Sequence, residues 1–291
     1  MNNFEKKYQT FFDEFKKLPL EEKEFLVNKV NKIMNTTEFS SKHCYNTFKN
    51  LLNLAEHNDF KFNDKKIMEI GSGKYSIFTA LLWLSQNVQS FTAIDKYCEP
   101  FISPYWKKIY ADQFEDYCIR SNSILNLLNT DNWGKIEKQM SIYVGDYTEL
   151  DLPTGYFDFV YSMAVFEHIE NPALTVKKMF DSMAPGSISY HNIDLRPHEG
   201  DKLSPFTILK YSSDEWKRKK TNNNSWIYLN RLRSSDWINL FEETGFKILR
   251  IQTSNFQNTV TEKEKASFNQ EFWSYSIETL NHSILNITLR K

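Results

Sequence analysis

The fold of this chain is decided by one stretch, Lys66-Ile67-Met68-Glu69-Ile70-Gly71-Ser72-Gly73. Its apolar first half predicts a buried strand, and its two glycines let the backbone approach a ligand closely where a helix begins. Glycine is scarce, at 8 of 291 residues, so each glycine is expected where the backbone requires it. The stretch therefore predicts a strand, a ligand-binding turn and a helix in succession.

Short apolar runs alternate with helical stretches on both sides of this motif. Strands are predicted over residues 66–70, 91–94, 141–144, 157–161, 187–193, 246–252 and 283–289. Helices are predicted over residues 76–85, 172–183 and 235–244. Such alternation predicts an α/β fold, a Rossmann-like doubly wound sheet with crossover helices.

The chain divides by pattern into a helical extension over residues 1–60 and a main domain over residues 61–291. Aromatic residues recur at helical spacing in the extension, as in Phe4, Tyr8, Phe11 and Phe15. Its helices could pack on a core, cap a pocket or pair with a second copy in a homodimer. Insertions are expected at about 97–135 and 196–233, and the polar stretch 217–225 is expected to be a surface loop.

Composition excludes several classes of protein. The chain has 36 basic and 37 acidic residues, which is not the charge of a nucleic-acid-binding protein. No apolar run is long enough to cross a membrane, and the N-terminal residues do not resemble an export signal, so we expect a cytoplasmic protein. The spacing of its cysteines, Cys44, Cys98 and Cys118, supports neither disulfides nor a zinc site.

Three acidic residues lie at the ends of predicted strands, Glu69, Asp95 and Asp146. The carboxyl ends of neighbouring parallel strands form one crevice, so these acids are expected to face one ligand. Asp95 suits ribose hydroxyls and Asp146 an adenine amino group. Ser76 replaces the third glycine of a nicotinamide fingerprint, and Lys74 is followed by Tyr75 where a phosphate-binding P-loop has Ser or Thr.

The sequence resembles the class I S-adenosylmethionine-dependent methyltransferases, in their small-molecule branch. The matching stretches are residues 66–73, Ala93-Ile94-Asp95, Gly145-Asp146, Phe157-Asp158-Phe159-Val160-Tyr161-Ser162, Phe166-Glu167-His168-Ile169 and Phe241-Glu242-Glu243-Thr244-Gly245-Phe246. The resemblance implies seven strands with the last antiparallel, and S-adenosylmethionine as methyl donor with S-adenosylhomocysteine as product. It places Glu69, Gly71 and Gly73 at the methionine part, Asp95 at the ribose, and Asp146 with Tyr147 at the adenine. Ser72, Lys96 and Ser162 complete the predicted cofactor set.

Histidines after the fourth and fifth predicted strands are candidates for deprotonating a hydroxyl acceptor. We predict His191 as base, Asp194 as its orienting carboxylate, and His168 as a third catalytic or loop-pinning residue. A pairing of His191 with Asp194 requires the strand to end or bulge by Ile193, because residues three apart on a strand face opposite sides. A metal held by His191, Asp194 and His198 matches no standard spacing, so no metal is predicted.

The acceptor is predicted to be a polar small molecule, with a sugar or nucleotide-linked sugar favoured. The Asn/Asp-Pro-Pro-aromatic signature of amino-methyltransferases is absent at Tyr161-Ser162-Met163-Ala164, which favours O-methylation. The predicted substrate residues are Tyr105, Trp106, Arg196, His198 and Arg231. Alternatives are a lipid head group or natural product as acceptor, a cofactor-binding module without catalysis, and an NAD-dependent dehydrogenase.

Overall fold

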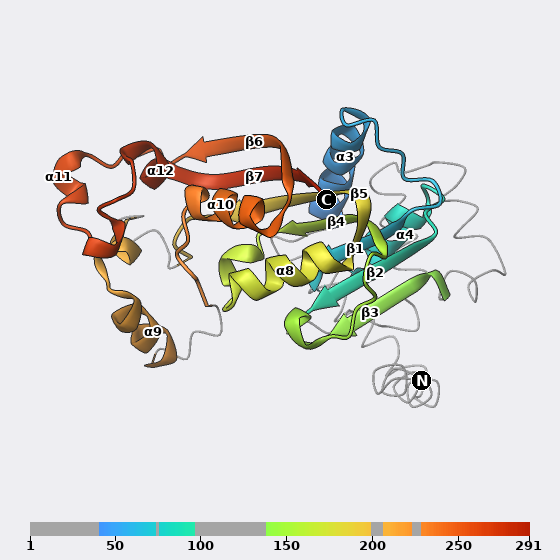
Figure 1. Cartoon of the computed structure of the whole chain (residues 1–291), viewed down its shortest axis with the longest axis horizontal. Helices are drawn as coiled ribbons and strands as arrows, with labels where there is room; N and C mark the ends of the chain where they lie inside the picture. The colour runs from blue at the N-terminus through green and yellow to red at the C-terminus, as the bar shows by residue number, and fades with distance from the viewer. Residues whose placement is uncertain (1–40, 74–75, 97–137, 199–205, 223–227) are drawn as a thin grey trace, which may run out of the picture. The chain divides into compact units, whose positions relative to one another are not determined.

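A computed structural model describes residues 41–73, 76–96, 138–198, 206–222 and 228–291. Within these residues, seven strands form one sheet in the order β3-β2-β1-β4-β5-β7-β6 (Figure 1). Strand β7 (His282–Arg290) runs antiparallel to both β5 (Met183–Asp194) and β6 (Lys247–Asn255). The sequence-based prediction of a doubly wound sheet with an antiparallel last strand is confirmed.

The chain divides into two compact units, with the first ending at Leu150 and the second beginning at Asp151. The first unit contains β1 (Lys66–Ile70), β2 (Ser90–Asp95) and β3 (Met140–Val144), paired in parallel. Helix α4 (Ser76–Leu84) packs on β2, and α3 (Ser41–Glu56) packs on α4. The fully buried Trp83 ring lies 5.0 Å from the Phe48 ring and 4.6 Å from the Phe62 ring, which anchors α3 to this core.

Only the last part of the predicted N-terminal extension, α3, belongs to the described residues. Residues 1–40 and 97–137 lie outside them, and so do most of the predicted extension and the whole insertion expected at 97–135. Cys44 is the cysteine within the described part of the chain, and it is not in a disulfide.

The second unit contains β4 (Phe157–Met163), β5, β6 and β7, of which β4 and β5 pair in parallel. Helices α8 (Pro172–Ser182) and α10 (Ser234–Thr244) contact each other, α8 contacts β5, and α10 contacts β6 and β7 (Figure 1). Asn171 caps α8 by accepting a hydrogen bond from the backbone N–H of Leu174, as its position before Pro172 predicts.

A group of short helices in the second unit surrounds a separate apolar cluster. These are η4 (Thr207–Lys210), α9 (Ser213–Asn222), α11 (Glu262–Lys265), η5 (Gln270–Phe272) and α12 (Ile277–Asn281). The cluster contains Phe206, Ile208, Leu209, Trp216, Leu229, Val260, Phe268, Phe272 and Leu280. The prediction of a loop from residue 217 was wrong as far as Asn222, because Trp216 seats α9 on this cluster.

Among the helices that the structure describes, none has the length and apolar character needed to cross a membrane.

Candidate active site

The two glycines after β1 hold a backbone conformation that favours glycine. Gly71 has φ 75° and Gly73 has φ 59°. The backbone N–H groups of Gly71 and Ser72 donate to the carbonyl oxygen of Ile94 at 2.7 and 3.1 Å. The N–H of Gly73 donates to Asp95 Oδ2 at 2.8 Å. The loop is therefore tied to the end of β2, and Asp95 is brought to the glycine pair as predicted from the sequence.

Asp146 follows β3 and begins the short helix η2 (Tyr147–Glu149). Its carboxylate accepts from the backbone N–H and hydroxyl of Thr148, and Lys96 Nζ lies 3.0 Å from Asp146 Oδ2. The hydrogen bond from the Thr148 side chain, and then that from Lys96, lower the pKa of Asp146 to about 2 against the opposing effect of burial. Asp146 is thus an anion at neutral pH, next to the buried Tyr147. Glu69, at the end of β1, is buried as well.

Ser162 and His191 form a hydrogen-bonded pair inside the second unit. Ser162 Oγ lies 2.8 Å from His191 Nδ1, and both side chains are fully buried. The imidazole packs against both Phe166 and Phe241, with ring centroids 4.5 Å and 5.7 Å away. Burial lowers the pKa of His191 to about 3, so the ring is neutral throughout the physiological range.

The predicted pairing of His191 with Asp194 is not made. Strand β5 continues to Asp194, so the two residues fall on opposite faces, as regular strand alternation requires. Asp194 instead accepts from Arg196, with Nε–Oδ1 at 2.8 Å and Nη2–Oδ2 at 2.6 Å, and lies 3.5 Å from His198 Nε2. Burial acts to raise the pKa of Asp194, but hydrogen bonds from Arg196 and His198 outweigh it and hold the pKa well below its usual range.

The turn after β4 brings two more groups to Asp194. It forms the short helix η3 (Phe166–His168), in which His168 Nε2 lies 3.8 Å from Glu167 Oε1 and the His168 ring meets the His198 ring at 4.8 Å. Burial raises the pKa of Glu167 to about 8. We call Glu167, His168, Asp194, Arg196 and His198 the polar cluster. Four of the predicted catalytic and substrate residues, His168, Asp194, Arg196 and His198, therefore meet in this cluster, while His191 lies apart.

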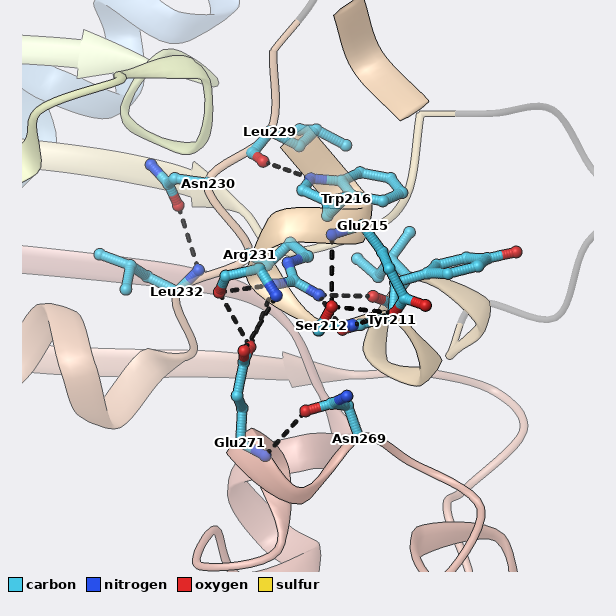
Figure 2. Close-up of polar contacts among 12 residues, drawn as sticks. Tyr211, Ser212, Glu215, Trp216, Leu229, Asn230, Arg231, Leu232, Asn269 and Glu271 are labelled. Atoms are coloured by element: carbon cyan, nitrogen blue, oxygen red, sulfur yellow. Dashed lines mark hydrogen bonds and ion pairs between the residues drawn. The ribbon is translucent and has the colours of Figure 1, made fainter. Parts of the chain in front are cut away.

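Arg231 was predicted to bind the acceptor, and its guanidinium is engaged within the second unit (Figure 2). It donates to the carbonyl oxygens of Ile208 and Tyr211 at 3.1 and 2.6 Å, and to Ser213 Oγ at 3.0 Å. Glu271 Oε2 lies 3.3 Å away. These contacts join η4, α9 and η5 around the buried guanidinium, and the acceptor role of Arg231 stays a prediction.

Two predicted acceptor residues, Tyr105 and Trp106, lie outside the described residues.

The sequence-based predictions missed two residues at the turn after β4. Glu167 was noted only as part of a matching stretch, although an acid beside a histidine at a strand end was a usable signal. Asn230 donates to the carbonyl oxygens of Phe166 and Ile169 at 2.7 and 3.1 Å, and so fastens the η3 turn from 64 and 61 residues away. No local pattern reveals such a contact.

The strand order, the antiparallel β7 and the glycine turn tied to Asp95 define a class I methyltransferase. A family described as a methyltransferase domain matches residues 42–251, which is more than half of the chain. The chain therefore belongs to this family, and its methyl donor is S-adenosylmethionine.

Solved structures of low sequence identity also match. A candidate methyltransferase from Bacillus halodurans is 16% identical, with a TM-score of 0.47, and the match covers 84% of this chain and 98% of the other. An S-adenosylmethionine-dependent methyltransferase from Mesorhizobium loti is 14% identical, with a TM-score of 0.44 and coverage of 79% and 93%. A candidate sarcosine dimethylglycine methyltransferase from Galdieria sulphuraria is 12% identical, with a TM-score of 0.49 and coverage of 85% and 86%.

Proposed function

We propose that this methyltransferase methylates a hydroxyl group of a polar small molecule, with a sugar or nucleotide-linked sugar as the favoured acceptor. The observation that carries the proposal is the polar cluster at the ends of β4 and β5. It joins the Asp194–Arg196 ion pair to two histidines, and the Arg196 side chain is 53% exposed. Guanidinium, carboxylate and imidazole groups together offer the hydrogen-bond donors and acceptors that can bind a hydroxyl-rich molecule.

In this proposal the donor is held by eight of the nine residues predicted for it, Glu69, Gly71, Ser72, Gly73, Asp95, Lys96, Asp146 and Tyr147. The close glycine backbone at residues 71–73 admits the methionine part, and the carboxylates of Asp95 and Asp146 accept from ribose and adenine. Ser162 differs from the others, because its hydroxyl is buried against His191. We therefore give Ser162 the task of shaping the wall of the site rather than contacting the donor.

The transfer needs alignment more than activation, because the methyl carbon of the donor is already bonded to a sulfonium. The acceptor oxygen forms a bond to that carbon as the carbon–sulfur bond breaks, and S-adenosylhomocysteine departs. The hydroxyl proton passes to solvent on the exposed side of the polar cluster. His191 is a poor candidate for accepting it, since a buried ring with a pKa of about 3 does not take up protons at neutral pH. We assign His191 to positioning Ser162 and Phe166, and we retain Asp194 and His168 as groups that face the acceptor.

The test is transfer of a labelled methyl group from S-adenosylmethionine to a panel of free sugars, nucleotide-linked sugars, phosphorylated amino-alcohol head groups and phenolic compounds. The product is analysed for an O-methyl ether by mass spectrometry and NMR. Arg196→Ala is expected to raise the KM for a sugar acceptor, whereas the matched variant Arg250→Ala, at an exposed arginine of β6, leaves it unchanged. Labelling only of an amine acceptor would overturn the proposed O-methylation. Binding of the donor with no transfer to any acceptor class would favour a module without catalysis.

A further inference from the structure

We propose that Glu167, His168 and His198 form a binding site for a divalent transition metal ion, with Zn²⁺ as the ion that fits this ligand set. Each residue offers one ligand atom, and the three atoms all lie within 4.8 Å of one another. Two histidines and a glutamate are a known set for zinc with an open fourth position. Binding requires neither the methyl donor nor an acceptor, so this inference stands apart from the proposed O-methylation.

The spacing is close to that of a formed site. Atoms bound tetrahedrally to one zinc ion at about 2.1 Å lie about 3.4 Å apart. Glu167 Oε1 and His168 Nε2, at 3.8 Å, are close to that spacing. A closing movement of at most roughly 1.4 Å brings all three atoms to the spacing of a tetrahedral zinc site. A rotation of the partly exposed His198 side chain, at 26% exposure, supplies such a movement.

Glu167 is the second observation that points to a cation. Its side chain is 4% exposed, and within the described residues neither of its carboxylate oxygens makes a hydrogen bond of normal geometry. The backbone N–H groups of Glu167 and Asp194 lie close enough to favour its charged form but do not complete its shell. A buried carboxylate without complete partners is unfavourable unless it is neutralised or coordinates a metal.

His168 has the arrangement that is typical of metal-binding histidines. Its Nδ1 lies 2.7 Å from the carbonyl oxygen of Tyr228, which can only accept a hydrogen bond. Nδ1 therefore carries the proton of the neutral ring, and Nε2, the nitrogen facing Glu167, has the lone pair. Metal-ligating histidines usually donate their other ring N–H to a carbonyl or carboxylate in this manner. Asp194, 3.5 Å from His198, can support the second histidine in the same way.

The surroundings also favour a cation. The η3 turn that carries Glu167 and His168 is fastened by Asn230, so two of the three ligands are held in place before binding. Arg196 is the nearby positive charge, and its guanidinium is neutralised by its bidentate pair with Asp194. Once bound to a cation, Glu167 supplies one negative charge to the site as a carboxylate. The exposed parts of His168 and His198, at 29% and 26%, give the ion a path from solvent.

The experiment measures binding of Zn²⁺ and Co²⁺ to the full chain without an affinity tag, after chelator treatment and in the absence of donor and acceptor. We expect one Zn²⁺ per chain by calorimetry, and a Co²⁺ complex whose visible bands show a low coordination number and whose near-ultraviolet spectrum shows no thiolate charge-transfer band. His198→Ala and the isosteric Glu167→Gln are each expected to weaken zinc binding by more than about 100-fold. Loss of a residue that only hydrogen-bonds to a metal ligand weakens binding by at most about 100-fold, so a larger effect marks a direct ligand. His57→Ala, at a histidine in the exposed turn after α3, is the matched control and should bind as the unaltered chain does.

Several results would overturn the site. These are no saturable binding to the unaltered chain, a thiolate band in the Co²⁺ spectrum, or equal affinity in His198→Ala and the unaltered chain. If Glu167→Gln does not fold, His198→Ala decides alone, because its target side chain is partly exposed. Zinc binding without methyl transfer would leave the site standing and count against the proposed O-methylation. Methyl transfer to a hydroxyl acceptor by a chain that binds no metal would overturn the metal site and leave the proposed O-methylation standing.

Discussion

Protonation of His191 offers the sharpest test of the packing around the candidate site. The ring is fully buried and its pKa is lowered to about 3 by burial, whereas an unfolded histidine has a pKa of about 6.5. Below pH 6.5 the unfolded chain takes up a proton that the folded chain does not. The contribution of the neutral His191 ring to the free energy of unfolding is therefore fully present above about pH 6.5. It is lost progressively as the pH falls from about 6.5 towards about 3.

The magnitude follows from the distance to the unfolded pKa. At pH 5 the gap is about 1.5 pH units, and each unit is worth about 1.4 kcal/mol, so His191 alone lowers the free energy of unfolding by about 2 kcal/mol relative to pH 7. His191→Gln removes the titrating ring while keeping a group that can hydrogen-bond Ser162. Between pH 7 and pH 5, the unaltered chain should lose about 2 kcal/mol more than this variant.

The assay is urea unfolding of both proteins at pH 7, 6 and 5. Carboxylates titrate in both proteins, so their effect on the free energy of unfolding cancels when the two losses are compared. An NMR titration of the His191 ring protons gives a second measurement that does not depend on the variant folding. Equal losses in the two proteins, or a ring that titrates near pH 6.5 in the folded state, would refute the assignment of His191 as a sealed, neutral group.

Two further predictions concern backbone strain and a buried cation. Gly73→Ala and Gly155→Ala both place a side chain at positive φ, 59° and 63°, with no atom within 4 Å of the new carbon, so each should cost about 1–2 kcal/mol in urea unfolding. Only Gly73→Ala should also weaken S-adenosylhomocysteine binding in calorimetry, and an equal effect of the two on binding would contradict the assignment of the loop. Arg231→Ala should lower the free energy of unfolding by about 3 kcal/mol, because the buried carbonyl of Ile208 and the part-buried carbonyl of Tyr211 lose their donor. Arg250→Ala, at an exposed position, should change it by less than about 0.5 kcal/mol, and similar losses in the two variants would argue against Arg231 as the centre of its contacts.

The sheet could be predicted from the sequence because its strands are short apolar runs that end in glycine or acidic residues. Strand β1 has the predicted bounds, residues 66–70. Strand β5 begins earlier than predicted, at Met183 rather than residue 187. Its pairing with β4 shifts register between Phe157 and Phe159, so the expected Pro185-Gly186 turn is taken up as an irregularity within the strand.

The separate cluster around Trp216 could not be predicted in the same way. Phe256, Phe268 and Phe272 contribute to it from short segments that have neither helical nor strand periodicity. The sequence predicted Arg231 as an acceptor residue and did not reveal its contacts, since only the fold brings the carbonyl oxygens of Ile208 and Tyr211 to its guanidinium.

The cofactor set and the catalytic set differ in how far local sequence determines them. Gly71, Gly73 and Asp95 depend on one turn and one neighbouring strand, so the sequence could predict that they share one crevice, and the Gly73 N–H donates to Asp95 there. Alternation along β5 gives the face of His191, but it does not reveal that Phe166 and Phe241 cover the ring. Asp194 pairs with Arg196 and not with His191 because β5 continues to Asp194. No pattern in the sequence determines where β5 ends.

Calorimetric titration with S-adenosylhomocysteine, beside NAD, tests most directly whether these residues form a methyl-donor site. We expect S-adenosylhomocysteine to bind, NAD not to bind, and Asp95→Asn to lose the binding, because the ribose hydroxyls then lack a carboxylate acceptor. Binding of NAD instead, or no binding of either ligand, would contradict the assignment of the glycine loop and Asp95 to the methyl donor.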